Sequence, residues 1–157
     1  MSAGFKELQT RVRERASVAL AADAKALHEK LSAGDERPGE FESVLVDPVK
    51  YSVRVVPAHL GQEVPAALYE GGGHRLLLGL AFKLALARLV GKVPFVLLDE
   101  PTYGLDDRHR ATLLERVAGL GVADQILLVT HETMGRAAGR RIRVTREGAE
   151  SRVAEVP

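Results

Sequence analysis

Two adjacent carboxylates, Asp99 and Glu100, follow an apolar run that begins at Pro94. A continuous apolar run of this kind is typical of a strand covered on both faces in a parallel sheet, and ligands bind at the carboxyl ends of such strands. Because successive strand residues point to opposite sides, the two carboxylates cannot easily share one role. One could hold Mg²⁺ while the other orients a water molecule. An exposed acidic turn would look the same in isolation, so the surrounding sequence has to decide.

Two other segments have residue types suited to the same chemistry. Upstream, the glycines at 71–73 open a run expected to form a helix from about His74 to Val90. Free backbone N–H groups and the helix dipole meet at such a turn, which makes it an anion-binding site. Downstream lie Gly104-Leu105-Asp106 and an apolar run that ends at Thr130 and His131. A histidine at the end of a buried strand is more often structural, so its functional interpretation rests on these neighbours.

Hydrophobic periodicity predicts the elements that position these residues. A stripe of apolar residues every three or four positions from Phe5 to Leu31 predicts one helix, and a polar loop follows it. The other expected elements are, in chain order, a hairpin (41–46 and 51–56), a connector (59–67), the helix from about 74 to 90, a strand (94–99), a helix (106–118), a strand (125–130), a short helix (134–138) and a closing hairpin (142–145 and 152–156). Strands that alternate with helices predict an α/β fold with a mainly parallel central sheet flanked by helices.

The bulk composition narrows the class of protein. The chain has 157 residues, the size of one ordinary domain, with 46% apolar and 27% charged residues. Its formal net charge of +1 gives no global attraction to nucleic acid, and the lack of cysteine excludes disulfides and cysteine-ligated metals. The N-terminus is too charged for a secretory signal, and the longest apolar stretch, 76–90, is too short to span a bilayer. We expect an intracellular protein with no membrane partner.

The order of these motifs resembles that of a known family. The glycine turn, the acidic pair, Gly104-Leu105-Asp106 and His131 resemble, in that order, the signature motif, Walker B motif, D-loop and H-loop of ABC-type ATPases. Segments 73–85, 99–106 and 129–132 look like those of the SMC-like ATPase of DNA double-strand-break repair, the Rad-family partner of the Mre nuclease.

The resemblance covers roughly residues 41–156 and implies the C-terminal half of an ATPase head. It divides the chain into a helix from the base of a coiled coil at 1–34 and the C-terminal lobe of the ABC ATPase head at 35–157. The implied function is an ATP-switched clamp in DNA double-strand-break repair, with ATP and Mg²⁺ as cofactors. The implied partners are a second head in a head-to-head dimer, the nuclease subunit and DNA. The implied localisation is cytoplasmic, or at the nucleoid in a prokaryote.

The resemblance also implies roles for single residues. Asp99 would bind Mg²⁺ through water, and Glu100 would polarise the attacking water. His131 would touch the γ-phosphate, and Asp106 would act across the dimer. The turn that contacts the phosphates bound to the partner head would consist of Gly71, Gly72, Gly73 and His74.

Two departures from the family pattern affect function. The family signature reads Leu-Ser-Gly-Gly-Glu/Gln, which places Gly71 at the serine and His74 at the acidic or amide position. A glycine lacks the hydroxyl that would bond the γ-phosphate, so Gly71→Ser is expected to tighten the dimer unless Gly71 has a positive φ. The sequence also holds no G-x-x-x-x-G-K-[ST] motif, since Gly91-Lys92 is followed by Val93. ATP hydrolysis is therefore expected only when an N-terminal half with a P-loop completes the site.

The residues alone leave other functions open. A non-hydrolysing structural or interaction protein would account for the changed signature and the missing P-loop, but it would need neither Glu100 nor His131. The nucleotide-binding half of a transporter fits the long N-terminal helix less well, and a metal nuclease would lack a third acidic ligand. The remaining histidines have no metal-ligand spacing, so we assign no zinc. An arginine-rich C-terminal segment fits either a DNA-backbone contact or a solvated face, and it contains Arg136, Arg140, Arg141, Arg143, Arg146 and Arg152.

Overall fold

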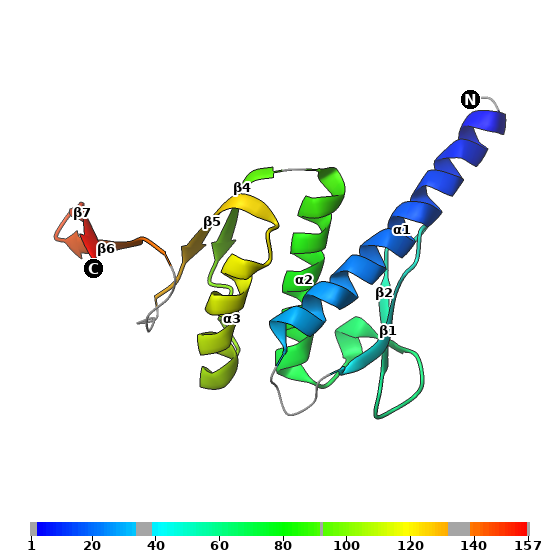
Figure 1. Cartoon of the computed structure of the whole chain (residues 1–157), viewed down its shortest axis with the longest axis horizontal. Helices are drawn as coiled ribbons and strands as arrows, with labels where there is room; N and C mark the ends of the chain where they lie inside the picture. The colour runs from blue at the N-terminus through cyan, green and yellow to red at the C-terminus, as the bar shows by residue number, and fades with distance from the viewer. Residues whose placement is uncertain (1–2, 34–38, 92, 132–138, 157) are drawn as a thin grey trace.

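The computed structural model describes residues 3–33, 39–91, 93–131 and 139–156. It begins with the 29-residue helix α1 (Ala3–Leu31), which confirms the helix predicted from the apolar stripe. The stripe has two environments along this helix, because Leu27 and Leu31 are buried in the core whereas Phe5 and Leu8 are more than half exposed. Figure 1 shows the N-terminal half of α1 extending beyond the rest of the fold.

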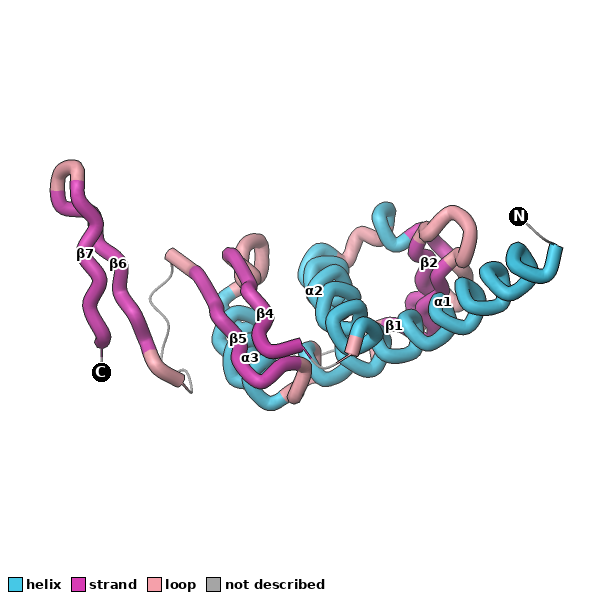
Figure 2. The backbone as a smooth tube through the Cα atoms, turned by 90° about the horizontal axis from the view of Figure 1, so that it is seen from above, coloured by secondary structure: helices cyan, strands magenta, loops and turns pink. Residues whose placement is uncertain are grey.

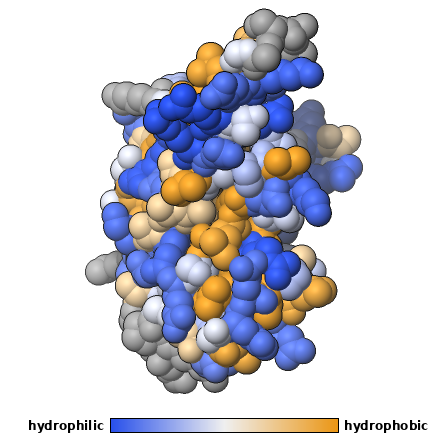
Figure 3. Space-filling model, turned by 90° about the vertical axis from the view of Figure 1, so that its right-hand side faces the viewer, coloured by the Kyte–Doolittle hydropathy of each residue, from blue (hydrophilic) through white to orange (hydrophobic). Residues whose placement is uncertain are grey.

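The projecting half of α1 carries apolar side chains on a charged helix. Phe5, Leu8, Val12 and Val18 are exposed, and arginine, lysine and glutamate residues lie between them in the sequence. Figure 3, which views the molecule from this side, shows apolar surface interleaved with hydrophilic surface. Within the described residues, no helix combines the length and apolar character needed to cross a membrane.

A small antiparallel sheet follows α1 in the chain. Its strands lie in the order β1 (Phe41–Val46), β2 (Val53–Pro57) and β3 (Val64–Pro65), so the predicted hairpin is confirmed. A 3₁₀ helix, η1 (Ala66–Leu68), leads from this sheet toward the next helix. The sheet packs on α1 and on the next helix, α2 (Gly72–Val90), through a cluster of buried residues: Ala21, Phe41, Val44, Val55, Tyr69 and Leu78.

The turn between β1 and β2 is closed by one carboxylate. Asp47 accepts hydrogen bonds from the backbone N–H groups of Val49 and Lys50 at 2.8 and 2.7 Å. The bond from Lys50 and then that from Val49 hold the pKa of Asp47 below its ordinary value, because both stabilise the ionised form. The strand β2 starts at Val53 rather than at the expected Tyr51, since Tyr51 has a φ of 54° and its backbone is not extended.

Helix α2 (Gly72–Val90) lies at the centre of the fold. Leu77 and Leu84 are at most 1% exposed, but Leu76, Leu86 and Leu89 are 42–47% exposed, so the predicted apolar helix is present and is buried on part of its surface by the described residues. The helix packs along α1, and Arg88 near its C-terminus binds the Asp23 carboxylate of α1 at 2.8 Å. The glycine turn therefore opens a helix that packs on α1.

The strands β4 (Val93–Asp99) and β5 (Ala123–Val129) are parallel neighbours, and α3 (Asp107–Gly119) connects them. Their register pairs Asp99 with Val129, so the carboxyl ends of both strands lie at the same edge. The described parallel sheet has these two strands, whereas the other five strands form the antiparallel sheet and a separate hairpin. The expected parallel arrangement is present, but it is smaller than a complete central sheet.

The two faces of the β4–β5 pair differ in burial. Val96, Leu98 and Ile126 contact the core that α1, α2 and α3 build, and Figures 1 and 2 show α3 lying against the pair. On the other face, Phe95 and Leu97 are 55% and 59% exposed. The expectation that these strands are covered on both faces is wrong for the described residues, because the helices that form the core pack on one face.

The last described element is the hairpin of β6 (Arg141–Glu147) and β7 (Glu150–Val156), which confirms the predicted closing hairpin. Figures 1 and 2 show this hairpin standing apart from the helices. Its apolar side chains Ile142 and Val144 are accordingly 60% and 65% exposed. The short helix expected at 134–138, which includes Arg136, lies outside the described residues.

Candidate functional site

The acidic pair lies where β4 ends. Asp99 is the last residue of the strand, and Glu100 follows it with a φ of 44°. A non-glycine residue in this left-handed region carries strain of roughly 1–3 kcal/mol, and such strain persists where surrounding contacts hold it. The backbone thus turns sharply at Glu100, directly after the strand that carries Asp99.

The contacts of Glu100 tie it to the end of β5. Its backbone N–H donates to the carbonyl oxygen of Val129 at 2.9 Å. Its carboxylate accepts the backbone N–H of His131 at 2.7 Å and the hydroxyl of Thr130 at 3.2 Å. One backbone bond and two carboxylate bonds, to three consecutive residues, therefore hold Glu100 across the strand ends.

The structure brings His131 to the same place. Its Nε2 lies 3.6 Å from Oε1 of Glu100, while its side chain is 95% exposed. The imidazole is accordingly open to a ligand from solvent while its backbone holds the carboxylate. The two residues that sequence reasoning proposed for the γ-phosphate and for the attacking water are neighbours.

Asp99 lies on the exposed face of the sheet, on the side of Leu97. Among the described residues, no group of three or more histidines, aspartates or glutamates is arranged to hold a metal ion. Mg²⁺ commonly takes one or two carboxylates and completes its shell with waters and substrate phosphates, so a lone exposed carboxylate fits this ion when nucleotide is present. The binding of Mg²⁺ through water that we expect for Asp99 stays a prediction.

The segment after the acidic pair forms a turn that leads into α3. Gly104 has a φ of 80°, and Leu105 is buried in the core. Asp106 is the N-cap of α3, since its carboxylate accepts the backbone N–H of His109 at 2.9 Å and lies 2.7 Å from Nδ1 of the same residue. The contact across a dimer that we expect for Asp106 stays a prediction, and the cap is a second role that sequence reasoning missed.

The glycine turn is built as a bare helix start. Gly71 is the N-cap of α2 with a φ of −69°, and Gly72 and Gly73 begin the helix with no side-chain cap. The first N–H groups of a helix have no intrahelical acceptors, so they remain available to an anion. Gly71 does not have the positive φ that would strain a serine, but the ring of Tyr69 occupies the space where a side chain at Gly71 would lie.

His74 belongs to the same turn but faces the interior. Its side chain is 15% exposed, and its Nε2 lies 4.0 Å from Oε2 of Glu40. Its ring centroid is 5.4 Å from that of His28 and 6.1 Å from that of His109. The direct nucleotide contact expected for His74 stays a prediction, whereas its inward neighbours had no signal in the sequence because they come from three separate elements.

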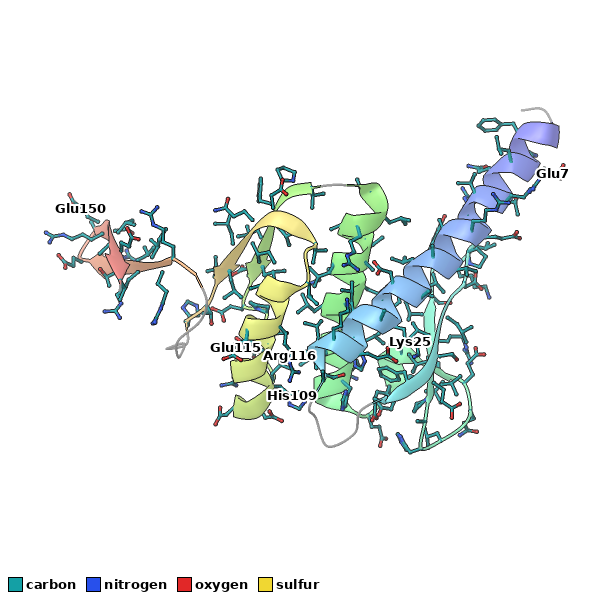
Figure 4. All side chains as sticks on the ribbon, in the orientation of Figure 1. Glu7, Lys25, His109, Glu115, Arg116 and Glu150 are labelled. Carbon is teal, nitrogen blue, oxygen red and sulfur yellow. The ribbon has the colours of Figure 1, made fainter. Side chains whose placement is uncertain are left out.

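The structure places the candidate site residues in two separate groups. Glu100 and His131 meet at the ends of β4 and β5, and the glycine turn meets the start of α3, where a Cβ on Gly73 would lie 3.8 Å from the His109 ring. Figure 4 shows His109 and Arg116 on the side of α3 that faces α2, and Arg116 donates to the carbonyl oxygen of Leu31 at 2.7 Å. The second set is therefore braced by all three helices.

Comparisons with known proteins place this geometry in a family. No protein-family model matches the chain. The DNA double-strand break repair Rad50 ATPase of Pyrococcus abyssi is 37% identical over 118 residues, which are 73% of this chain and 13% of the relative. The chain thus spans about one eighth of the length of that relative.

Solved structures agree on the fold. A chain from a structural study of ATP-driven dimerisation and DNA-stimulated activation of SMC ATPases covers 94% of this chain and is itself covered to 89%, with a TM-score of 0.69 and 22% identity. An SMC head bound to the C-winged helix domain of ScpA covers 91% of this chain and is covered to 44%, with a TM-score of 0.66 and 20% identity. The chain therefore has a fold similar to part of an SMC-type head and is homologous to the family of Rad50 DNA double-strand break repair ATPases, which confirms the resemblance found in the sequence.

Proposed function

We propose that this chain is one half of an ATPase head that binds and hydrolyses Mg²⁺–ATP when an N-terminal half with a P-loop completes it, and that the head acts as an ATP-switched clamp in DNA double-strand-break repair. The observation that carries the proposal is the strained Glu100, held at the ends of β4 and β5 beside the exposed His131. A structural or interaction protein would need neither this strain nor this exposure.

Each side chain would have a distinct task. Glu100 would orient and polarise the attacking water, since its hydrogen bonds to Thr130 and His131 stop the carboxylate from turning away. His131 would contact the γ-phosphate with its exposed imidazole. Asp99 would hold Mg²⁺ on the open face of the sheet, where the ion would neutralise charge on the phosphates.

The exposed apolar face of the β4–β5 pair supports the proposal that a second half completes the head. Phe95, Leu97, Leu127 and Val129 expose between 42% and 59% of their surface on these two strands. Apolar strand faces in parallel sheets are normally covered, and each strand of the pair has one edge open among the described residues. A P-loop half that adds strands and layers here would bury this face and supply the phosphate cradle that the sequence lacks.

The remaining partners follow from the family. In a head-to-head dimer, the glycine turn at 71–73 and Asp106 would act on the nucleotide of the partner head, and one of the structural relatives comes from work on ATP-driven dimerisation. A second relative is an SMC head with a bound protein domain, which supports a protein partner such as the nuclease subunit. DNA would contact the arginines of β6 and β7 through its phosphates. The protein would act in the cytoplasm or at the nucleoid.

The test is a reconstitution. The chain alone is expected to hydrolyse no ATP, and a P-loop-bearing N-terminal half supplied as a separate chain is expected to create Mg²⁺-dependent hydrolysis. Glu100→Gln should stop turnover but leave ATP bound, because the amide keeps the shape and cannot polarise water, whereas Asp99→Asn should weaken retention of Mg²⁺–ATP. Glu115→Gln on the exposed surface of α3 is the matched control and should change neither.

Two results would contradict the proposal. One is robust hydrolysis by the isolated chain, and the other is hydrolysis by the completed complex that survives Glu100→Gln. Equal loss of nucleotide binding in Glu100→Gln and Asp99→Asn would contradict the separate roles of the two carboxylates.

A further inference from the structure

Behind the glycine turn lies a group of titratable side chains that the proposed reaction does not use. They come from separate parts of the chain: α1, the residue before β1, the loop between β2 and β3, the first turn of α2 and the first turn of α3. We call them the histidine cluster, and its members are His28, Glu40, His59, His74 and His109.

Glu40 is the acidic centre of this cluster. Its side chain is 3% exposed, and its Oε1 accepts no hydrogen bond from any described residue. The nearest bases are His59, whose Nδ1 lies 3.8 Å from Oε1, and His74, whose Nε2 lies 4.0 Å from Oε2. A buried carboxylate without compensation is costly, so it attracts positive charge and hydrogen-bond donors to itself.

Glu40 is the carboxylate of the histidine cluster that lies beside His74, and the other members of the cluster are histidines. His28 is 1% exposed, and burial followed by the charge of His74 lowers the pKa of His28 to about 4, so His28 is neutral between pH 6 and 8. His109 is engaged by Asp106 at 2.7 Å. His59 is 48% exposed and approaches the other oxygen of Glu40. The inward pull on the His74 ring therefore comes from Glu40.

We propose that His74 is a positioning residue of the signature turn, which holds Gly71–Gly73 in place through its inward tether to Glu40 and does not itself touch the nucleotide. Three consecutive glycines leave a backbone with little intrinsic preference, so an anchor at the next residue restricts it. His74 lies in the first turn of α2, and the carbonyl oxygen of Gly71 accepts the N–H of Arg75 at 2.9 Å. The inference rests on the proposed function for its meaning, but the tether itself can be tested without nucleotide.

The experiment is amide hydrogen exchange by NMR on the full 157-residue chain, alone and without ATP. The reporter is the N–H of Arg75, because its bond to Gly71 closes the turn. His74→Ala and Glu40→Gln are each expected to speed its exchange about 5- to 30-fold, while the amides of β4 and β5 keep their rates. Glu42→Gln, the same change at an exposed residue of β1, is the matched control and should leave Arg75 unchanged.

A double variant separates the tether from a merely structural effect. If His74 and Glu40 act through their mutual contact, exchange at Arg75 in the His74→Ala/Glu40→Gln double variant should be no faster than in His74→Ala alone. His74→Gln, whose amide can still donate to Glu40, should keep the protection, and His59→Gln, which changes the other base near Glu40, should also keep it.

The outcomes decide the matter independently of ATP hydrolysis. Exchange at Arg75 that is unaffected by His74→Ala and Glu40→Gln would overturn the proposal, and so would an acceleration spread evenly over the chain. If His74→Ala fails to fold, the isosteric Glu40→Gln and the conservative His74→Gln give the same decision. Accelerations that add in the double variant would assign the two effects to separate contacts and overturn the role of His74.

Discussion

The substitution Gly71→Ser would restore the family's serine, and the structure predicts that it destabilises the chain. A Cβ on Gly71 would lie 2.4 Å from Cε1 and 2.8 Å from Cζ and Oη of Tyr69. Real contacts are longer than this, so the ring must move. Tyr69 is 6% exposed and packs edge-on against Phe41 at a centroid distance of 5.2 Å, which leaves the ring little room.

The cost can be set against the expected gain. Extra atoms in a packed region cost about 1–3 kcal/mol. A regained hydrogen bond to a charged phosphate contributes roughly 1.5–3 kcal/mol, and only in the ATP-bound dimer. The packing cost and the gain from the hydrogen bond are similar in size and opposite in sign. Gly71→Ser is therefore not expected to tighten the dimer, in contrast to the expectation from the sequence alone. In the free chain the cost stands alone and corresponds to a fall in Tm of about 2–12 °C.

The assay is thermal and urea unfolding of the chain, followed by circular dichroism. Gly72→Ser is the matched control, because a Cβ there meets nothing within 4 Å and should change stability by less than about 0.5 kcal/mol. In a Tyr69→Ala background the ring is absent, so Gly71→Ser should add little further loss. Equal losses from Gly71→Ser and Gly72→Ser, or no loss from Gly71→Ser, would refute the collision with Tyr69.

Three further predictions concern stability. Gly104→Ala should cost about 1–3 kcal/mol in urea unfolding, because φ is 80° and a Cβ would lie 3.0 Å from Leu76, and an unchanged midpoint would contradict this. The folded-state pKa of His28 is about 4 and its ordinary value is 6.5, so the unfolded chain binds more protons between these values. The stability that neutral His28 contributes is complete above pH 6.5 and is lost as pH falls toward 4, by up to about 3 kcal/mol. In His28→Leu this part of the pH dependence of the free energy of unfolding should be absent, and its persistence would contradict the assignment to His28. Arg88→Met removes both the ion pair with Asp23 and the hydrogen bond to the carbonyl oxygen of Leu120, so its cost should shrink by about 0.2–1 kcal/mol, without vanishing, in an Asp23→Asn background, and an unchanged cost would contradict a contribution from the ion pair.

Local sequence patterns account for most of the secondary structure. The stripe that ends at Leu31, the all-round apolar run of α2 and the apolar strand before Asp99 each depend on neighbours within a few residues, and the structure confirms all three elements. The shift of β2 away from Tyr51 has a different origin, because a φ of 54° in a turn has no signature in hydrophobic periodicity. The residue types and order of the motifs were also enough to identify the family.

For the candidate site, too, the residue types could be predicted from the sequence, whereas the contacts between them could not. Sequence reasoning proposed Glu100 and His131 from their motifs, but the 2.7 Å bond between them joins residues 31 positions apart and required the register of β4 on β5. It also placed His74 at the nucleotide from its position beside Gly73, and that contact stays a prediction, whereas the closeness of His74 to Glu40 and His28 could be seen only in the structure.

The sequence by itself determined which residues are the candidates for the chemistry, because residue type, order and spacing are properties of the chain. The tertiary structure alone decided how those residues are held. The Phe41 ring that packs against Tyr69, the Thr130 and His131 donors that hold the strained Glu100, and the burial of Glu40 each involve residues distant in sequence, and packing at that scale leaves no periodic trace in the chain.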